Sequence, residues 1–140
     1  MKINLTRAGL PPSDNLIAEF ASTVGHPLPG DYVDFLREEN GGVTPCFVSI
    51  KGVQIQCFYS LREERSEGLF YEWVASRGFL PPEFLPIAFD ITGEQVCLRL
   101  SDGTVFGMNE DTGEPVRMSA SVGELLDTLR EAFDPPTPGG

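Results

Sequence analysis

Apolar residues recur at helical spacing in four stretches of the chain. The first stretch follows Ser13 or Asp14, either of which can cap a helix. The last follows Ser121, which forms a capping box with Glu124 ahead of a long apolar stripe. The pattern therefore predicts helices near residues 14–24, 29–40, 67–77 and 121–133.

Between these helices, apolar and polar residues alternate, which is typical of strands with one buried and one wetter face. Two strands are expected at 46–50 and 53–59, joined by a tight turn at Lys51-Gly52. A proline-broken connector follows, in which we interpret Phe79 and Phe84 as core residues. The remaining strands are predicted at 87–89, 95–100 and 104–108, with a short one near 115–118.

The alternation also assigns side chains to the two faces of the sheet. In the second strand it groups Val53, Ile55, Cys57 and Tyr59 on one face. In the strand at 95–100 it groups Val96, Leu98 and Leu100, with Cys97 and Arg99 opposite. No repeat or linker divides the 140 residues, so we predict one α+β domain over residues 1–134, with helices packed on one face of an antiparallel sheet. Residues 135–140 are expected to form a flexible tail.

The formal net charge of −11 narrows the range of partners. Such a charge repels phosphate, and the scattered Lys and Arg residues form no basic patch, so direct nucleic-acid binding is not expected. A basic protein partner is favoured instead. The sequence contains no apolar run of the roughly 18 residues that a membrane span needs, and no signal peptide is recognised at the start. We expect a cytoplasmic protein, and a monomer is favoured.

Candidate catalytic and metal-binding residues are few. His26 is the single histidine, and it lies in a His-Pro link with no nucleophile motif nearby. Cys46, Cys57 and Cys97 stand in apolar contexts, where cysteine behaves as a small hydrophobic residue. The segment NEDTGEP resembles a calcium loop only loosely, because the twelfth position from Asn109 is Ala120 rather than a glutamate. We therefore expect no enzymatic activity, no cofactor and no bound metal.

Acidic residues gather in the connections of the second group of strands. Residues 84–118 contain six acids and only two cations, Arg99 and Arg117. Turn formation accounts for Asp102 and for Asp111, but it does not require Glu94, Glu110 or Glu114. We predict that five of the acids lie at neighbouring loop ends and form part of a partner-binding rim: Asp90, Glu94, Glu110, Asp111 and Glu114.

Several segments together resemble the SUKH superfamily, which contains the Smi/Knr-type regulator of yeast cell-wall synthesis and many bacterial immunity proteins. LPGDYVDFLREENGG at 28–42 is similar to the family's L-P-x-x-Y-x-x-F-L…N-G-G helix, and FLPIAFDITGEQVCLRL at 84–100 to its L-P-I segment. DGTVFGMNEDTG and the closing SVGELLDTL also resemble the family. Two departures are Ile91-Thr92-Gly93-Glu94, where the family often has paired glycines, and Met108, where it often has an aromatic residue.

The resemblance implies an α+β fold with a curved, mixed or antiparallel sheet flanked by helices, without a shared enzymatic activity. In bacteria it implies neutralisation of a toxin, often a nuclease, by direct binding. The first interpretation is therefore an immunity protein that binds a basic toxin. The alternative is a regulatory or scaffolding module that binds a protein unrelated to toxins, and a third is a small hydrolase or metal-dependent enzyme.

Overall fold

The helices lie where the sequence predicts them. The computed structural model describes residues 5–78, 80–90, 92, 94–108 and 114–133, so the tail at 135–140 lies outside the described residues. The helices of these ranges are α1 (Asp14–Val24), α2 (Gly30–Glu38), α3 (Gly68–Ala75), which continues into a 3₁₀ turn at Ser76–Gly78, and α4 (Val122–Phe133). All four predicted helices are therefore confirmed, with ends that differ by one or two residues.

The strands of the described residues form a 6-stranded sheet in the order β1-β2-β3-β4-β5-β6. They are β1 (Gly42–Ile50), β2 (Val53–Phe58), β3 (Phe84–Phe89), β4 (Gln95–Arg99), β5 (Val105–Met108) and β6 (Pro115–Ser119). Every pair of neighbouring strands is antiparallel, so of the two expected kinds of sheet, mixed or antiparallel, the protein has the antiparallel one.

Two strands begin earlier than predicted. β1 begins at Gly42 rather than at 46, and β3 begins at Phe84 rather than at 87. Pro86 made the second segment look like a connector, because proline cannot donate a hydrogen bond to a neighbouring strand. The sheet accommodates Pro86 at a register shift between Pro86 and Ala88.

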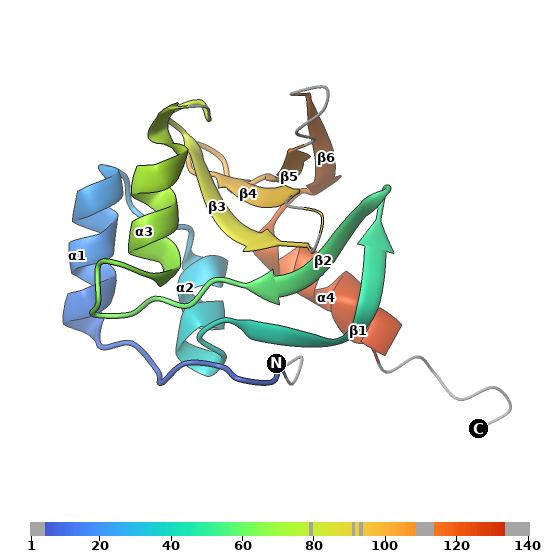
Figure 1. Ribbon diagram of the computed structural model, residues 1–140, viewed down its shortest axis with the longest axis horizontal. Helices are drawn as coiled ribbons and strands as arrows, with labels where there is room; N and C mark the ends of the chain where they lie inside the picture. The colour runs from blue at the N-terminus through green and yellow to red at the C-terminus, as the bar shows by residue number, and fades with distance from the viewer. Residues whose placement is uncertain (1–4, 79, 91, 93, 109–113, 134–140) are drawn as a thin grey trace, which may run out of the picture.

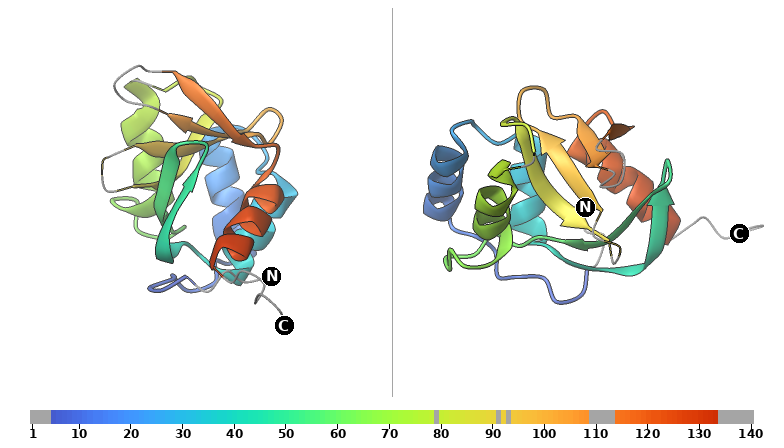
Figure 2. Two further views of the ribbon diagram at one scale, coloured as in Figure 1. Left: turned by 90° about the vertical axis from the view of Figure 1, so that its right-hand side faces the viewer. Right: turned by 45° about the horizontal axis from the view of Figure 1, so that its top comes forward.

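The sheet is strongly curved (Figures 1 and 2). Register shifts in β1, β3 and β5 bend it, as β-bulges do. The bend brings the β1–β2 hairpin across β5, where a Cβ atom added to Gly107 would lie 2.5 Å from Val53 Cγ2. Glycine at position 107 therefore allows two strands that are not neighbours in the sheet to touch.

Side chains from all four helices and from the sheet form one main core. Phe20, Leu36, Leu69 and Leu129 contribute from the helices, and each is fully or almost fully buried. The α+β class with helices packed on one face of a curved sheet is therefore confirmed. Trp73, the single tryptophan, is also buried in this core.

The predicted grouping of side chains in β2 is wrong at its end. Val53 and Ile55 are buried as expected, but the next core residue is Phe58, which is 1% exposed, rather than Cys57. The register of β1 against β2 shifts between Val43 and Val48, and that shift changes which residues of the hairpin face inward. Cys57 consequently lies on the other face and is only partly buried.

Asn40 joins three segments of the chain inside the protein. Its Nδ2 donates to the Leu10 carbonyl at 2.8 Å and to the Leu61 carbonyl at 2.7 Å, and its Oδ1 accepts from Leu61 N at 2.7 Å. The following Gly41 has φ +77, and a Cβ there would lie 2.6 Å from Ser60 Oγ. The Asn-Gly-Gly sequence thus fixes how the end of α2 meets the segment after β2.

Candidate partner-binding surface

The two acidic connections lie at the same end of the sheet. Phe89 pairs with Gln95 across the first connection, and Met108 pairs with Pro115 across the second. Because Gln95 also pairs with Met108, the four residues are consecutive cross-strand neighbours. The strand ends that carry Asp90, Glu94 and Glu114 are therefore neighbours in the sheet.

Asp90 is not an exposed rim residue as expected, because only 4% of it is accessible. Its Oδ1 accepts hydrogen bonds from Thr92 N at 2.9 Å, Thr92 Oγ1 at 2.7 Å and Glu94 N at 3.0 Å. A short acidic side chain that accepts from the backbone two and four residues later stabilises a turn. Asp90 therefore shapes the β3–β4 connection, and its exposure was predicted incorrectly.

The other predicted rim residues have different positions. Glu94 is partly buried directly before β4, and Glu114 is exposed directly before β6. Glu110 and Asp111 lie outside the described residues. Asp102, which was assigned to a turn from sequence, accepts from Thr104 N at 3.0 Å and pairs with Arg99 at 2.5 Å. The hydrogen bonds that Asp102 accepts from Arg99 and from Thr104 lower the pKa of its carboxyl.

A row of side chains crosses the outer face of the sheet, opposite the main core. Residues that pair directly across antiparallel strands point to the same face. The row consists of Cys57, Phe89, Gln95, Met108 and Pro115. Its first four members are only partly buried and the last is exposed, so this row is accessible to solvent.

Tyr59 joins the row from the end of β2. Its ring stacks on Phe89 with 5.0 Å between centroids, and its hydroxyl donates to Gln95 Oε1 at 2.9 Å. Burial raises the pKa of Tyr59, and the nearby charge of Glu72 raises it further. Glu72 comes from α3, which packs beside β3, and burial raises the pKa of its carboxyl as well. Sequence reasoning missed Glu72, although it is the only charged residue in the helix GLFYEWVA.

A small second core lies next to this row on the outer face. Leu80, Phe84 and Cys97 are buried in it, and Phe106 and Met108 pack against it. Phe84 is therefore a core residue as predicted, whereas Phe79 lies outside the described residues. Cys97, expected on the wetter face, is fully buried here, and burial raises the pKa of its thiol to about 12.

The guanidinium of Arg77 closes one side of the second core. It stacks on Trp73 at 3.3 Å and donates to the carbonyls of Trp73, Pro82 and Phe84. Arg99 lies 4.8 Å over the Phe106 ring and is paired with Asp102. Arg77 and Arg99 are therefore both held by contacts within the chain.

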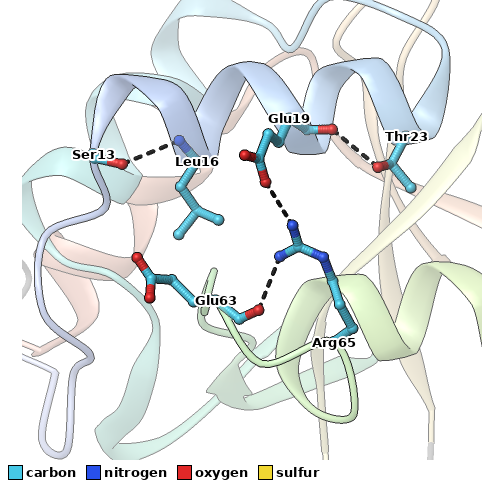
Figure 3. A network of polar contacts seen from close by, with 6 residues as sticks. All are labelled: Ser13, Leu16, Glu19, Thr23, Glu63 and Arg65. Atoms are coloured by element: carbon cyan, nitrogen blue, oxygen red, sulfur yellow. Dashed lines mark hydrogen bonds and ion pairs between the residues drawn. The ribbon is translucent and has the colours of Figure 1, made fainter.

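A groove of about 610 Å³ lies elsewhere, between the segment before α1 and the segment after β2. Figure 3 shows the polar contacts beside it, where Arg65 donates to Glu19 Oε2 at 2.5 Å and to the Glu63 carbonyl at 3.0 Å. Ser13 caps α1 at this place by accepting from Leu16 N. Beside this groove, the acid Glu19 is already paired with Arg65. The acidic connections at the end of the sheet therefore match a basic partner better than the groove does.

The structure also gives positions for the residues that were considered for catalysis from the sequence. His26 is exposed in the link between α1 and α2, with Nδ1 2.7 Å from the Pro27 carbonyl. Cys57 and Cys97 are free thiols, and the side chain of Cys46 lies outside the described set. Among the described residues, no group of three or more His, Cys, Asp or Glu side chains is placed to hold a metal ion. Nor is any helix of these ranges long and apolar enough to cross a membrane.

Comparison with known families decides the relationship that the sequence motifs indicate. Residues 11–128 match the SMI1 / KNR4 family (SUKH-1). The chain belongs to this family. A search of curated proteins found no match.

The motifs that resemble the SMI1 / KNR4 family form identifiable parts of the structure. The Asn-Gly-Gly sequence holds the buried contacts of Asn40, and the L-P-I segment forms β3. The two departures lie elsewhere. One is in the β3–β4 connection, which Asp90 shapes, and the other is Met108 on the outer face. Neither departure falls in the main core as far as the described residues show, and Met108 packs against the second core.

Proposed function

We propose that this protein is a non-catalytic protein-binding domain that acts as a bacterial immunity protein in the cytoplasm and neutralises a basic toxin by direct binding. The proposal is supported chiefly by membership in the SMI1 / KNR4 family, which fits a protein-interaction role. It is also supported by an open sheet face that carries Tyr59, Phe89 and Met108 beside acidic connections. A nuclease is the kind of toxin whose basic substrate channel best complements the net charge of −11.

The two features of the surface have separate tasks in this proposal. Exposed carboxylates at the sheet end attract a basic protein over a distance and raise its association rate. The aromatic and aliphatic side chains of the outer face are then buried in the complex, which slows dissociation. Neither task needs a nucleophile, a proton-transfer group or a metal ion.

Co-expression with the protein encoded immediately upstream tests the proposal. We expect that the upstream protein alone arrests growth, that this chain restores growth, and that the two co-purify. A stable complex with a partner that is not toxic would contradict immunity and support the regulatory or scaffolding alternative. Turnover of a substrate by the isolated chain would contradict a non-catalytic role.

Charge reversal of Glu94, Glu110 and Glu114 to Lys tests the acidic sheet end. We expect the association rate with the toxin to fall at least about tenfold at low salt and much less at high salt, because salt screens exposed charges. Each exposed pair contributes only about 0–1 kcal/mol, so the dissociation rate should change little. Stopped-flow binding at several salt concentrations measures both rates.

The matched control reverses three exposed acids elsewhere, Asp34, Glu64 and Glu131, to Lys. This variant has the same net charge as the first. If both triple variants slow association equally, the effect comes from total charge and the acidic sheet end is not a binding rim.

A further inference from the structure

Glu72 is an isolated acid in an apolar setting. It is the only charged residue of α3, where Leu69, Phe70 and Trp73 are buried on the neighbouring face. Its side chain is partly buried, and within the described residues it forms no ion pair with a cation. A partly desolvated carboxylate without a counter-charge is costly, because burial disfavours its charged form. A positive charge supplied from outside would relieve that cost.

An aromatic pair lies near the start of α3, the helix that carries this carboxylate. The carbonyl of Ser60, which follows Tyr59, accepts a hydrogen bond from Leu69 N at 2.9 Å, and Glu72 comes about one helical turn after Leu69. The Tyr59 ring stacks on Phe89 at an interplanar angle of 27°, and the charge of Glu72 raises the pKa of Tyr59. The Tyr59 hydroxyl is already used in its hydrogen bond to Gln95, which fixes the orientation of the ring. Ring faces attract cations, and a planar guanidinium can stack on them.

Two cations of the chain on this side, Arg77 and Arg99, have other partners. Arg77 is held over Trp73 and donates to three backbone carbonyls, as well as to Ser76 Oγ. Arg99 is paired with Asp102 and stacked on Phe106. Within the described residues, no ion pair joins Glu72 to a basic side chain.

We propose that Glu72, Tyr59 and Phe89 form a binding site for an arginine side chain of the protein partner. Glu72 accepts hydrogen bonds from the guanidinium, and the aromatic rings contact its plane. Arginine fits better than lysine, because its planar fork pairs with a carboxylate and stacks on a ring at once. This site names the partner chemistry for the surface proposed above and rests on that proposed function.

Titration with the capped tripeptide acetyl-Gly-Arg-Gly-amide tests the site without a toxin. We expect NMR shifts at the backbone amides of Tyr59, Phe89 and Gln95, with binding at least about fivefold weaker for the citrulline peptide, which keeps the shape and loses the charge. Glu72→Gln should reduce arginine-peptide binding by a similar factor. The exposed Glu131→Gln control should leave binding unchanged.

Several outcomes would overturn the site. Equal binding of the arginine and citrulline peptides would do so, as would shifts scattered over other acidic residues that persist in Glu72→Gln. Phe89→Leu tests the ring separately from the charge, because it removes one aromatic face and keeps Glu72. This variant should weaken the binding of the arginine peptide only. An amide spectrum that keeps its dispersion shows that each variant is folded.

A toxin recovered by co-expression separates this site from the proposed function. If Glu72→Lys protects cells and binds the toxin as well as the parent protein does, the arginine site is wrong while the immunity function stands. If the arginine peptide binds as expected but no upstream protein is neutralised, the immunity function is wrong while the site stands.

Discussion

Replacing Asn40 with alanine is expected to lower the free energy of unfolding by about 3–4 kcal/mol. Asn40 is 2% exposed and makes three hydrogen bonds, to the Leu10 carbonyl and to both backbone groups of Leu61. Alanine would leave both backbone groups of Leu61 without this partner in a buried place, and the Leu10 carbonyl without it in a partly buried one. Each unsatisfied buried group costs about 1–3 kcal/mol, which is why the expected loss is large.

Urea unfolding followed by Trp73 fluorescence measures this loss, since Trp73 is the single tryptophan and lies in the main core. Asn15→Ala is the matched control, because Asn15 is exposed in α1, and it should change stability by less than about 0.5 kcal/mol. Asn40→Asp keeps the acceptor for Leu61 N but places a carboxylate against two carbonyl oxygens, so it should also be strongly destabilising. An Asn40→Ala protein as stable as the control would show that these three bonds do not hold the segments together.

Gly107→Ala is expected to lower the free energy of unfolding by about 1–3 kcal/mol, because its added methyl group would overlap the Val53 side chain. An added Cβ lies 2.5 Å from Val53 Cγ2 and 3.0 Å from Val53 Cβ. Val53 is buried at 6% exposure, and its branched side chain has little freedom to move aside. This contact exists only because the sheet curves, so the substitution tests the curvature.

A double-mutant cycle with Val53→Ala identifies the cause of this loss. Shortening Val53 makes room for the new methyl group, so the double variant should be more stable than the sum of the two single changes predicts, by at least about 0.5 kcal/mol. Denaturant unfolding of the four proteins gives this coupling. Additive losses would mean that Val53 and Gly107 are not in contact and that the β1–β2 hairpin does not cross β5.

The curvature of the sheet also determines which side chains form the proposed binding surface. The helices and the folded-over hairpin fill the inner side of the sheet, and the row from Cys57 to Met108 is left on the outer side. A variant that relaxes the curvature should therefore disturb this row as well. Stability and partner binding have to be measured separately for any substitution near Gly107.

Local chemistry determined most of the secondary structure. Ser13 accepts from Leu16 N and Ser121 from Glu124 N, which are the contacts that the capping pattern predicts. Gly103 lies between the strands predicted at 95–100 and 104–108, directly after the turn residue Asp102, and has φ +80, a backbone conformation that glycine adopts without strain. These features depend on residues within four positions of one another, so the order of residues alone was enough to place them.

Tertiary structure decided which side chains meet. Asp31 accepts from Gly123 N at the start of α4, across 92 positions, and no local pattern indicates that contact. Register shifts placed Phe58 rather than Cys57 in the core, and a second small core buried Cys97 on the face expected to be wetter. Bulges and packing of this kind arise from long-range contacts, which period-two alternation does not contain.

In the candidate site, too, some features follow from the sequence and others only from the tertiary structure. The sequence by itself determined that the second group of strands has acidic connections, and that a protein with this charge suits a basic partner. Only the tertiary structure showed that Asp90 turns inward to organise its own loop, and that the start of α3, the helix of Glu72, lies against the segment directly after β2. Composition and spacing fix local turns and charges, whereas burial depends on which distant segments pack together and exclude water.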